Sequence, residues 1–220
     1  MRTKTALVVG TATYLAGLAA GYQVLLRRWC LTWGATEDEV TREMPGDELL
    51  TAPDVIATRA ITIATSPGAI WPWLVQLGPG RGGAYTYDWI ENLLGLNMHS
   101  ANEILPQFQN ISVGDSFALG TSGPRMRVAV LEPEHALVFA SADGNWVWSF
   151  GLYPTDGGTR LVSRNRIAVP GARLPGRLFN RLVMEPGSWV MERKMLIGIE
   201  QRAERNSTPV AERPVDARTG

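Results

Sequence analysis

Apolar and polar positions alternate through the middle of the chain, as they do in antiparallel strands with one buried face. Four large apolar side chains fall on one face of residues 145–153: Trp146, Trp148, Phe150 and Leu152. Similar alternation, or a run of β-branched residues, predicts five further strands at 55–63, 113–119, 126–131, 136–141 and 160–169. Asp143 and Gly144 form one of the tight-turn sequences between them. We therefore expect a sheet of hairpin-linked strands.

Two short helices are predicted between the first strand and the remaining ones. Ser66 and Pro67 are residue types favoured at the start of a helix, and the apolar pattern continues to Val75. The second helix is predicted near residues 87–94 and is closed by Gly95. Neither is long enough to cover a sheet.

The end of the folded region is also predicted to be helical. Residues 175–184 and 188–205 have helical patterns, with a break expected at Glu185, Pro186 and Gly187. Helices segregated from hairpin-linked strands indicate the α+β class rather than a parallel, doubly wound sheet. Because only the C-terminal helix is long enough to cover a curved antiparallel sheet, we expect an elongated cavity between the two.

The N-terminal segment from Thr5 to Leu26 contains no charged residue. At about 1.5 Å rise per residue, a helix of this length crosses a hydrocarbon core of about 30 Å. Arg27 and Arg28 follow directly, which favours an uncleaved, single-pass N-terminal transmembrane helix. A cleaved signal peptide and a buried soluble helix remain alternatives. We expect a membrane protein with a cytoplasmic domain, although basic residues at both ends leave the orientation open.

Gly17 and Gly21 form a small-x-x-x-small pattern within this segment. Such a pattern lets two membrane helices approach closely, so helix dimerisation through these glycines is one interpretation. The alternative is that glycine is simply common in such helices.

The patterns divide the chain into four parts. These are a membrane anchor at 1–28, a connector at 29–53, a folded domain at 54–205 and a disordered tail at 206–220. The tail lacks aromatic residues, which is typical of disorder.

Composition narrows the classes of function. Lys plus Arg and Asp plus Glu both number 21, so the formal net charge is zero and no nucleic-acid partner is indicated. Cys30 is the only cysteine, and His99 and His135 lie far apart in the sequence. We therefore expect no disulfide, no metal site and no cofactor.

Four segments resemble the START-like (SRPBCC) superfamily, in its polyketide cyclase/dehydrase-like branch with membrane-tethered bacterial members. They are WCLTWG at 29–34, WPWLVQLG at 71–78, YTYDWIEN at 85–92 and MERKML at 191–196. The resemblance implies a helix-grip fold, in which a curved antiparallel sheet wraps on a long C-terminal helix around a hydrophobic cavity. It also implies a lipid, sterol or polyketide ligand. Only some members are enzymes and no catalytic motif is universal, so no catalytic residue is carried over.

Aromatic residues on the predicted helices and strands are candidates for the cavity wall. The candidate ligand-binding residues are Trp73, Tyr85, Tyr87, Trp89, Trp146, Trp148, Phe150 and Arg81. Arg81 lies in the glycine-rich loop 78–83, which matches G-x-G-x-x-G without the surrounding βαβ unit of a dinucleotide site. We interpret the loop 78–83 as a mobile loop at the cavity mouth. Arg164 and Arg166 are expected to face outward as ordinary solubilising charges.

Two functions of different classes follow. The first is a binding module that holds a hydrophobic or lipid-like small molecule at a membrane. The alternative is a polyketide cyclase or dehydratase, with His99 and either Asp88 or Glu91 as proton-transfer groups. The alternative requires these side chains to point into the cavity; otherwise Asp88 is a helix cap and Glu91 a solvated charge. A scaffold that only recruits a protein partner is a third interpretation.

Overall fold

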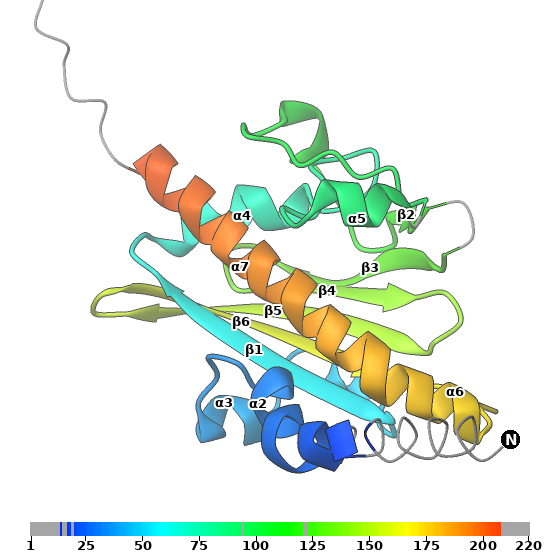
Figure 1. Ribbon diagram of the computed structural model, residues 1–220. Helices are drawn as coiled ribbons and strands as arrows, with labels where there is room; N and C mark the ends of the chain where they lie inside the picture. Colours follow the sequence, from blue (N-terminus) through cyan, green and yellow to red (C-terminus); the bar gives the residue numbers. More distant parts are fainter. Residues whose placement is uncertain (1–13, 15–16, 19, 94, 121–122, 208–220) are drawn as a thin grey trace, which may run out of the picture.

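The computed structural model describes residues 14, 17–18, 20–93, 95–120 and 123–207. Its centre is a six-stranded antiparallel sheet in the order β1-β6-β5-β4-β3-β2 (Figure 1). The strands are β1 (Val55–Ile63), β2 (Ser116–Ala118), β3 (Arg125–Glu132), β4 (Ala136–Ser141), β5 (Trp146–Thr155) and β6 (Gly158–Ile167). The predicted α+β class and antiparallel sheet are confirmed.

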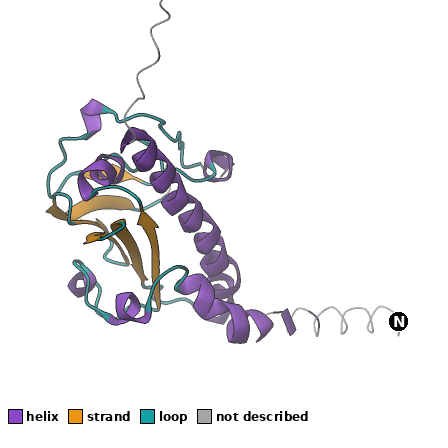
Figure 2. Ribbon diagram, turned by 90° about the vertical axis from the view of Figure 1, so that its left-hand side faces the viewer, coloured by secondary structure: helices purple, strands orange, loops and turns teal. Residues whose placement is uncertain are grey.

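The helices occur before, between and after the strands. Those of at least five residues in α-helical geometry are α2 (Arg27–Leu31), α3 (Glu37–Thr41), α4 (Pro67–Val75), α5 (Asp88–Leu93), α6 (Leu174–Phe179) and α7 (Glu185–Ser207). Short 3-10 and π turns complete them: η1 (Tyr22–Leu26), η2 (Asp47–Leu49), η3 (Pro106–Phe108) and η4 (Asn180–Met184). Figure 2 shows α7 running along one face of the curved sheet, an arrangement consistent with a helix grip.

Strand register decides which side chains face α7. In β5 and β6, Trp148 is opposite Asn165 and Phe150 is opposite Ser163. Arg59 of β1 is in turn opposite Ser163. Because side chains alternate between the faces of a sheet, all five point toward the same side, where α7 lies. The core of the domain is the apolar part of this layer, together with Trp73 and neighbouring residues of α4.

The predicted break at Glu185, Pro186 and Gly187 is wrong. The chain remains helical through these residues, because the π turn η4 widens the helix immediately before them. The backbone N–H of Glu185 bonds the carbonyl of Asn180, five residues earlier. A π turn gives the ring of Pro186 room that an uninterrupted α-helix lacks, so the irregularity is displaced upstream. The described helices from α6 to α7 therefore follow one another without a loop.

The predicted strand at 113–119 is shorter than expected, since β2 begins at Ser116. Gly114 has a φ of 99°, and the Asp115 carboxylate accepts a bond from the Ser112 N–H at 2.8 Å. These residues form a turn, which the apolar pattern alone does not distinguish from a strand end.

The outer face of the sheet, away from α7, is covered by residues 32–50. Met44 packs on Ala60 and Val162, and Leu50 packs on a second group that includes Val138. The segment predicted as a connector is therefore packed against the domain. Part of it forms α3, whose start is stabilised by a capping box of Thr36 and Glu39, and Glu39 accepts from Arg160 of β6 at 2.7 Å.

Arg164 and Arg166 do face outward, but the expectation of exposed solubilising charges is wrong. Arg164 is 2% exposed, and its guanidinium donates to Asp47 Oδ2 at 2.6 Å and to the Glu39 carbonyl at 2.6 Å. Arg166 donates to the Leu50 carbonyl at 2.9 Å. Because these acceptors lie in the N-terminal segment, the two arginines hold that segment on the sheet.

The predicted anchor lies mostly outside the described residues, as does the predicted tail from residue 208 onward. Among the residues that the structure does describe, no helix has both the length and the apolar character to cross a bilayer. Apart from the adjoining residues and the backbone of the same helix, no described atom lies within 4 Å of a Cβ built at Gly17 or Gly21. Dimerisation through these glycines stays a prediction.

Candidate functional site

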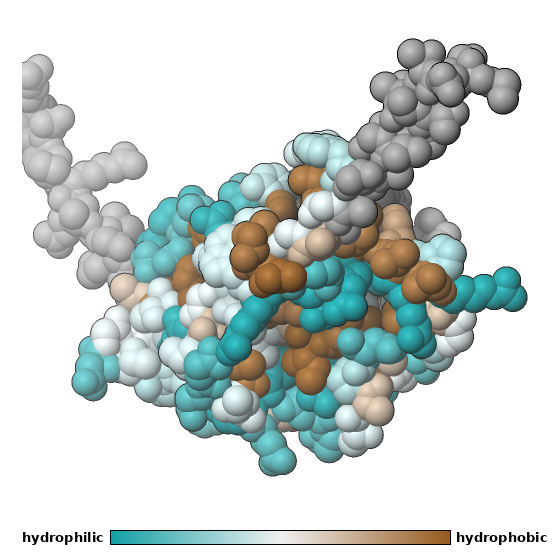
Figure 3. Space-filling view, turned by 60° about the horizontal axis from the view of Figure 1, so that its bottom comes forward, coloured by the Kyte–Doolittle hydropathy of each residue, from teal (hydrophilic) through white to brown (hydrophobic). Residues whose placement is uncertain are grey.

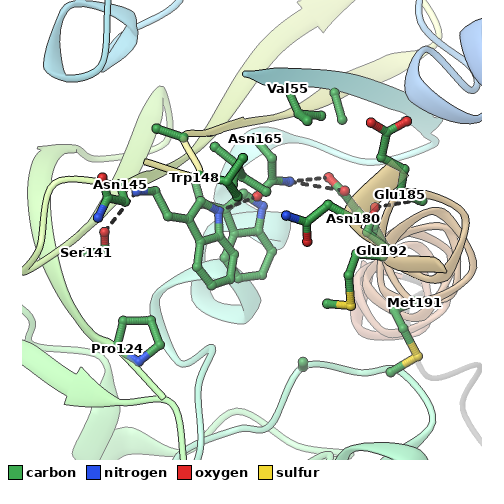
Figure 4. Close-up of a pocket in the computed structure, with 18 of the residues that line it drawn as sticks. Val55, Pro124, Ser141, Asn145, Trp148, Asn165, Asn180, Glu185, Met191 and Glu192 are labelled. Atoms are coloured by element: carbon green, nitrogen blue, oxygen red, sulfur yellow. Dashed lines mark hydrogen bonds between the residues drawn. The ribbon is translucent and has the colours of Figure 1, made fainter. Parts of the chain in front are cut away.

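A cavity of about 430 Å³ lies between α7 and the inner face of β1, β5 and β6 (Figure 4). It extends to η4, where Asn180 and Met184 contribute to the wall. Three methionines, Met184, Met191 and Met195, line the helix side. The thioether side chain adapts its shape to a ligand more readily than a branched one.

Two tryptophans form the sheet side of the cavity. The rings of Trp146 and Trp148 stack with centroids 5.9 Å apart and planes 21° apart. The Trp146 indole N–H donates to Asn165 Oδ1 at 2.7 Å, and the Trp148 indole N–H donates to Ser163 Oγ at 3.0 Å. Both polar atoms of the pair are thus satisfied by β6, which leaves ring surfaces for the cavity.

The carboxylate of Glu192 on α7 joins this network from the helix side. It accepts from Asn165 Nδ2 at 3.1 Å (Figure 4). It also accepts from Ser163 Oγ at 2.5 Å and pairs with the guanidinium of Arg59. Arg59 is fully buried and also donates to the Cys30 carbonyl at 2.9 Å. A buried charge is tolerated only when it is paired and hydrogen-bonded, and this network meets that condition.

A second carboxylate of α7, Glu185, is held in the same way. Arg27 of α2 donates to its two oxygens at 2.7 and 3.0 Å. Glu185 lines the cavity, so this pair ties the N-terminal segment to the helix beside it.

Thr86 and Glu91 contribute a further part of the wall. Glu91 is 6% exposed, and apart from each other neither its Oε2 nor the Thr86 hydroxyl has a hydrogen-bond partner among the described residues. Burial raises the pKa of the Glu91 carboxyl. Hydrogen bonding with the Thr86 hydroxyl lowers that pKa in part, and the negative charge of Asp88 raises it further. These two side chains differ from the satisfied network of Glu192.

No protein-family profile and no curated protein matches the sequence. Several solved structures are similar to this chain. A protein of Mesorhizobium loti has 18% identity over 70% of this chain and 100% of its own, with a TM-score of 0.43. A Polyketide_cyc-like protein of Corynebacterium glutamicum has 16% identity over 72% and 96%, with a TM-score of 0.39. Aha1 of Colwellia psychrerythraea has 17% identity over 70% and 99%, with a TM-score of 0.41.

The structure places only Trp146 and Trp148, of the predicted ligand-binding residues, in the cavity wall. Phe150 lies behind them, with its ring centroid 4.9 Å from that of Trp148. Trp73 and Tyr85 are buried in the core, where the Tyr85 hydroxyl donates to the Trp73 carbonyl at 3.0 Å. Their role is to position α4 against the loop that follows it.

The other three predicted residues lie away from this cavity. Trp89 is 69% exposed, and Tyr87 is exposed beside Lys194 of α7. Arg81 holds its glycine-rich loop in place, since it donates to the Val75 carbonyl at 2.9 Å and lies over the Phe108 ring. Arg81 also lines a second cavity of about 160 Å³, which does not include the tryptophan pair.

The three candidate proton-transfer groups do not all line the cavity. His99 is exposed and is not part of the cavity wall. Asp88 accepts from the Ser100 N–H at 2.8 Å and from its hydroxyl at 2.5 Å, so its carboxylate holds the loop after α5. Glu91 alone reaches the cavity. The arrangement that the enzyme alternative requires is therefore not formed in the described structure.

Sequence reasoning missed Arg59 and Glu192. Each had a signal: Arg59 interrupts a β-branched strand, and Glu192 falls on the helical stripe that includes Leu196 and Ile199. A charge within an apolar pattern indicates a buried partner. Which residue is that partner could be identified only from the fold.

Proposed function

We propose that this domain binds a hydrophobic small molecule in the cavity between α7 and the sheet. The observation that carries the proposal is the stacked pair Trp146 and Trp148, whose polar atoms bond Asn165 and Ser163 while their rings line an open volume of about 430 Å³. Small-molecule sites are typically about 300–1,000 Å³ and mainly apolar. If side chains filled this volume, the two tryptophans would serve only as part of the hydrophobic core.

The fixed sheet side and the flexible helix side support the same proposal. Hydrogen bonds fix the two tryptophans, whereas Met191 and Met195 opposite them have unbranched, intrinsically flexible side chains. A rigid aromatic wall with an adjustable methionine wall suits an apolar ligand of lipid-like or polycyclic shape. Catalysis through His99 is not part of the proposal, because that residue lies outside the wall.

Organic extraction of the purified full chain, followed by mass spectrometry, tests this function. We expect a bound apolar compound in the wild-type extract and its loss in Ala57→Phe, because Ala57 lines the cavity and a phenyl ring would occupy it. Ala142→Phe places the same ring on an exposed turn and serves as the matched control. An equal amount of the compound in both variants would contradict the assignment of the cavity.

We further propose that the domain works at a membrane surface. Exposed apolar side chains gather on α6 and η4, beside the cavity (Figure 3), and we call them the α6–η4 patch: Leu174, Leu178, Phe179, Val183 and Met184. Exposed arginines are interleaved with them at positions 173, 177 and 181. A contiguous apolar patch with cationic neighbours is typical of a surface that contacts anionic lipid. The cytoplasmic location of the domain stays a prediction.

Photolabelling in vesicles tests this second part. The full chain is reconstituted in phosphatidylcholine vesicles that contain phosphatidylglycerol and a diazirine-bearing lipid, and labelled peptides are mapped after irradiation. We expect label within residues 174–184 and none around Val113, which is equally exposed and apolar but distant in the fold. Label confined to the N-terminal segment would mean that the patch does not contact lipid.

A further inference from the structure

Asn180 of η4 lines the cavity, and its side-chain amide forms no hydrogen bond among the described residues. The polar side chains that β6 and α7 contribute to the wall are, by contrast, all bonded to other protein groups: Asn165, Glu185, Ser188 and Glu192. An amide in a cavity wall that lacks a protein partner finds its hydrogen bonds in water or in a bound ligand. The amide of Asn180 is therefore a group of this wall whose bonding capacity a ligand can use.

The amide of Asn180 is open to a ligand in the cavity. The residue is half-buried, and both polar atoms of its amide are accessible. Figure 4 shows this amide projecting into the cavity between the indole ring of Trp148 and the side chain of Glu192. A ligand seated against the tryptophan rings therefore lies beside a free hydrogen-bond donor and a free acceptor.

The wall differs between its enclosed part and its open part. Ala57, Ala84 and Met195 are buried, whereas Met184, which belongs to η4 as Asn180 does, is 53% exposed. A polar group costs less free energy at a partly hydrated position with a hydrogen-bond partner than in an enclosed apolar space. The polar end of a ligand therefore fits at η4, and its apolar part fits the enclosed space.

We propose that Asn180 binds the uncharged polar group of an amphipathic ligand, whose apolar part occupies the space beside Trp146 and Trp148. This inference rests on the proposed binding function and deepens it, because it gives the ligand one hydrogen-bonding end and a direction in the cavity. A carboxamide offers both a donor and an acceptor, so it can bond a hydroxyl or a carbonyl group.

The charges of the wall favour an uncharged group at Asn180. No lysine or arginine lines the cavity within the part of the chain that the structure describes, so an anionic group would find no cation there. The carboxylates on the helix side, Glu185 and Glu192, are already paired with Arg27 and Arg59, so a cationic group would compete with these arginines. An unpaired charge would cost more free energy in this site than one hydrogen bond to an amide returns.

Three probes that share a naphthalene ring test the subsite: 2-naphthalenemethanol, 2-ethylnaphthalene and protonated 2-naphthylmethylamine. Their affinities for the full chain are measured by displacement of the fluorescent dye N-phenyl-1-naphthylamine. In Asn180→Leu, the affinity for the alcohol relative to that for the hydrocarbon should fall about 10-fold, which corresponds to the loss of a hydrogen bond of about 1.4 kcal/mol. Asn110→Leu makes the same change at an exposed asparagine outside the wall and should leave this ratio as it is in wild type.

A charge placed at the same position gives a second test, which depends on a gain of binding rather than a loss. Asn180→Asp keeps the shape of the side chain but introduces a carboxylate without an arginine partner. If the polar end of the probe lies at this residue, the ammonium probe should bind Asn180→Asp about 10-fold more tightly than it binds wild type, because the two charges form a hydrogen-bonded ion pair.

The outcomes separate the subsite from the binding function. The same ratio of alcohol to hydrocarbon affinity in wild type and Asn180→Leu, with native circular dichroism spectra, would overturn the subsite and leave the binding function intact. An unchanged affinity of Asn180→Asp for the ammonium probe would also overturn it, as would a wild-type chain that binds the ammonium probe more tightly than the alcohol. Failure of all three probes to displace the dye from wild type would instead contradict the binding function.

Discussion

Two kinds of carboxylate face the cavity, and they differ in what surrounds them. Glu192 accepts from Arg59, Ser163 and Asn165 and is therefore a structural anion at the centre of the domain. Glu91 is buried without an ion pair among the described residues, and burial raises the pKa of its carboxyl. A carboxyl whose pKa is shifted by burial in a cavity wall is a candidate functional group.

Arg59 and Glu192 should stabilise the domain mainly because each neutralises the buried charge of the other. Removing one member leaves an uncompensated buried charge, so Glu192→Leu or Arg59→Met alone should cost about 3–5 kcal/mol of unfolding free energy. The double variant should cost less than the sum of the two. Urea unfolding followed by circular dichroism measures this cycle, with Glu103→Leu expected within about 0.5 kcal/mol of wild type. Strictly additive losses would show that the two side chains do not stabilise each other.

Glu91 should make stability depend on pH in a defined direction. The pKa of Glu91 in the folded protein lies above the ordinary value of 4.5. The contribution of Glu91 to the free energy of unfolding is therefore fully present below about pH 4.5, and it is lost as pH rises through the raised pKa. Glu91→Gln cannot ionise, and we expect it to be more stable than wild type at neutral pH, with the difference disappearing in acid. Urea unfolding of both proteins from acid to neutral pH checks this. A constant difference across the range would contradict the raised pKa; Glu103→Gln is the control.

The sequence alone located part of the site. Alternation placed Trp146 and Trp148 on one face, and that face does line the cavity. Aromatic residues such as Trp89 looked equally suitable, because a local pattern does not show which side of a short helix meets the sheet. The link between Arg59 and Glu192 joins residues 133 positions apart, and no local pattern pairs them.

The sequence pattern did not predict that residues 32–50 cover the outer face of the sheet. They have little periodicity, yet they cover the outer face of the sheet and accept hydrogen bonds from Arg164. The strands and α4 were predicted well because their patterns are strong over several residues. The π turn before α7 was not, because its cause is the placement of Pro186 within a helix that α4 and the sheet already hold.

Gly46 tests whether this outer layer is tightly packed. A side-chain carbon there would lie 2.6 Å from Val138 Cγ1, and φ is 93°. Gly80 has a comparable φ of 68° but nothing within 4 Å of the same position. We therefore expect Gly46→Ala to lose about 1–3 kcal/mol more unfolding free energy than Gly80→Ala, through overpacking rather than backbone strain. Equal losses in denaturant titrations would indicate that residues 44–50 are loosely attached.

On the scale of the whole molecule, α2 of the N-terminal segment and α6 lie at the same end of α7 (Figure 1). Arg27 joins the N-terminal segment to Glu185, and Met184 belongs to both the α6–η4 patch and the cavity wall. An apolar ligand that leaves a bilayer at the patch would therefore meet the cavity directly. The central claim in this account is that the space beside Trp146 and Trp148 is a binding site.

Titration of the full chain with N-phenyl-1-naphthylamine, an uncharged dye whose emission rises in apolar surroundings, tests that claim most directly. We predict saturable binding of one dye per chain, weakened about 10-fold or more in Ala57→Phe and in Ala84→Leu, because both substitutions project into the cavity. Ala142→Phe should bind as wild type does. Undiminished affinity in both cavity variants, with native circular dichroism spectra, would contradict the account.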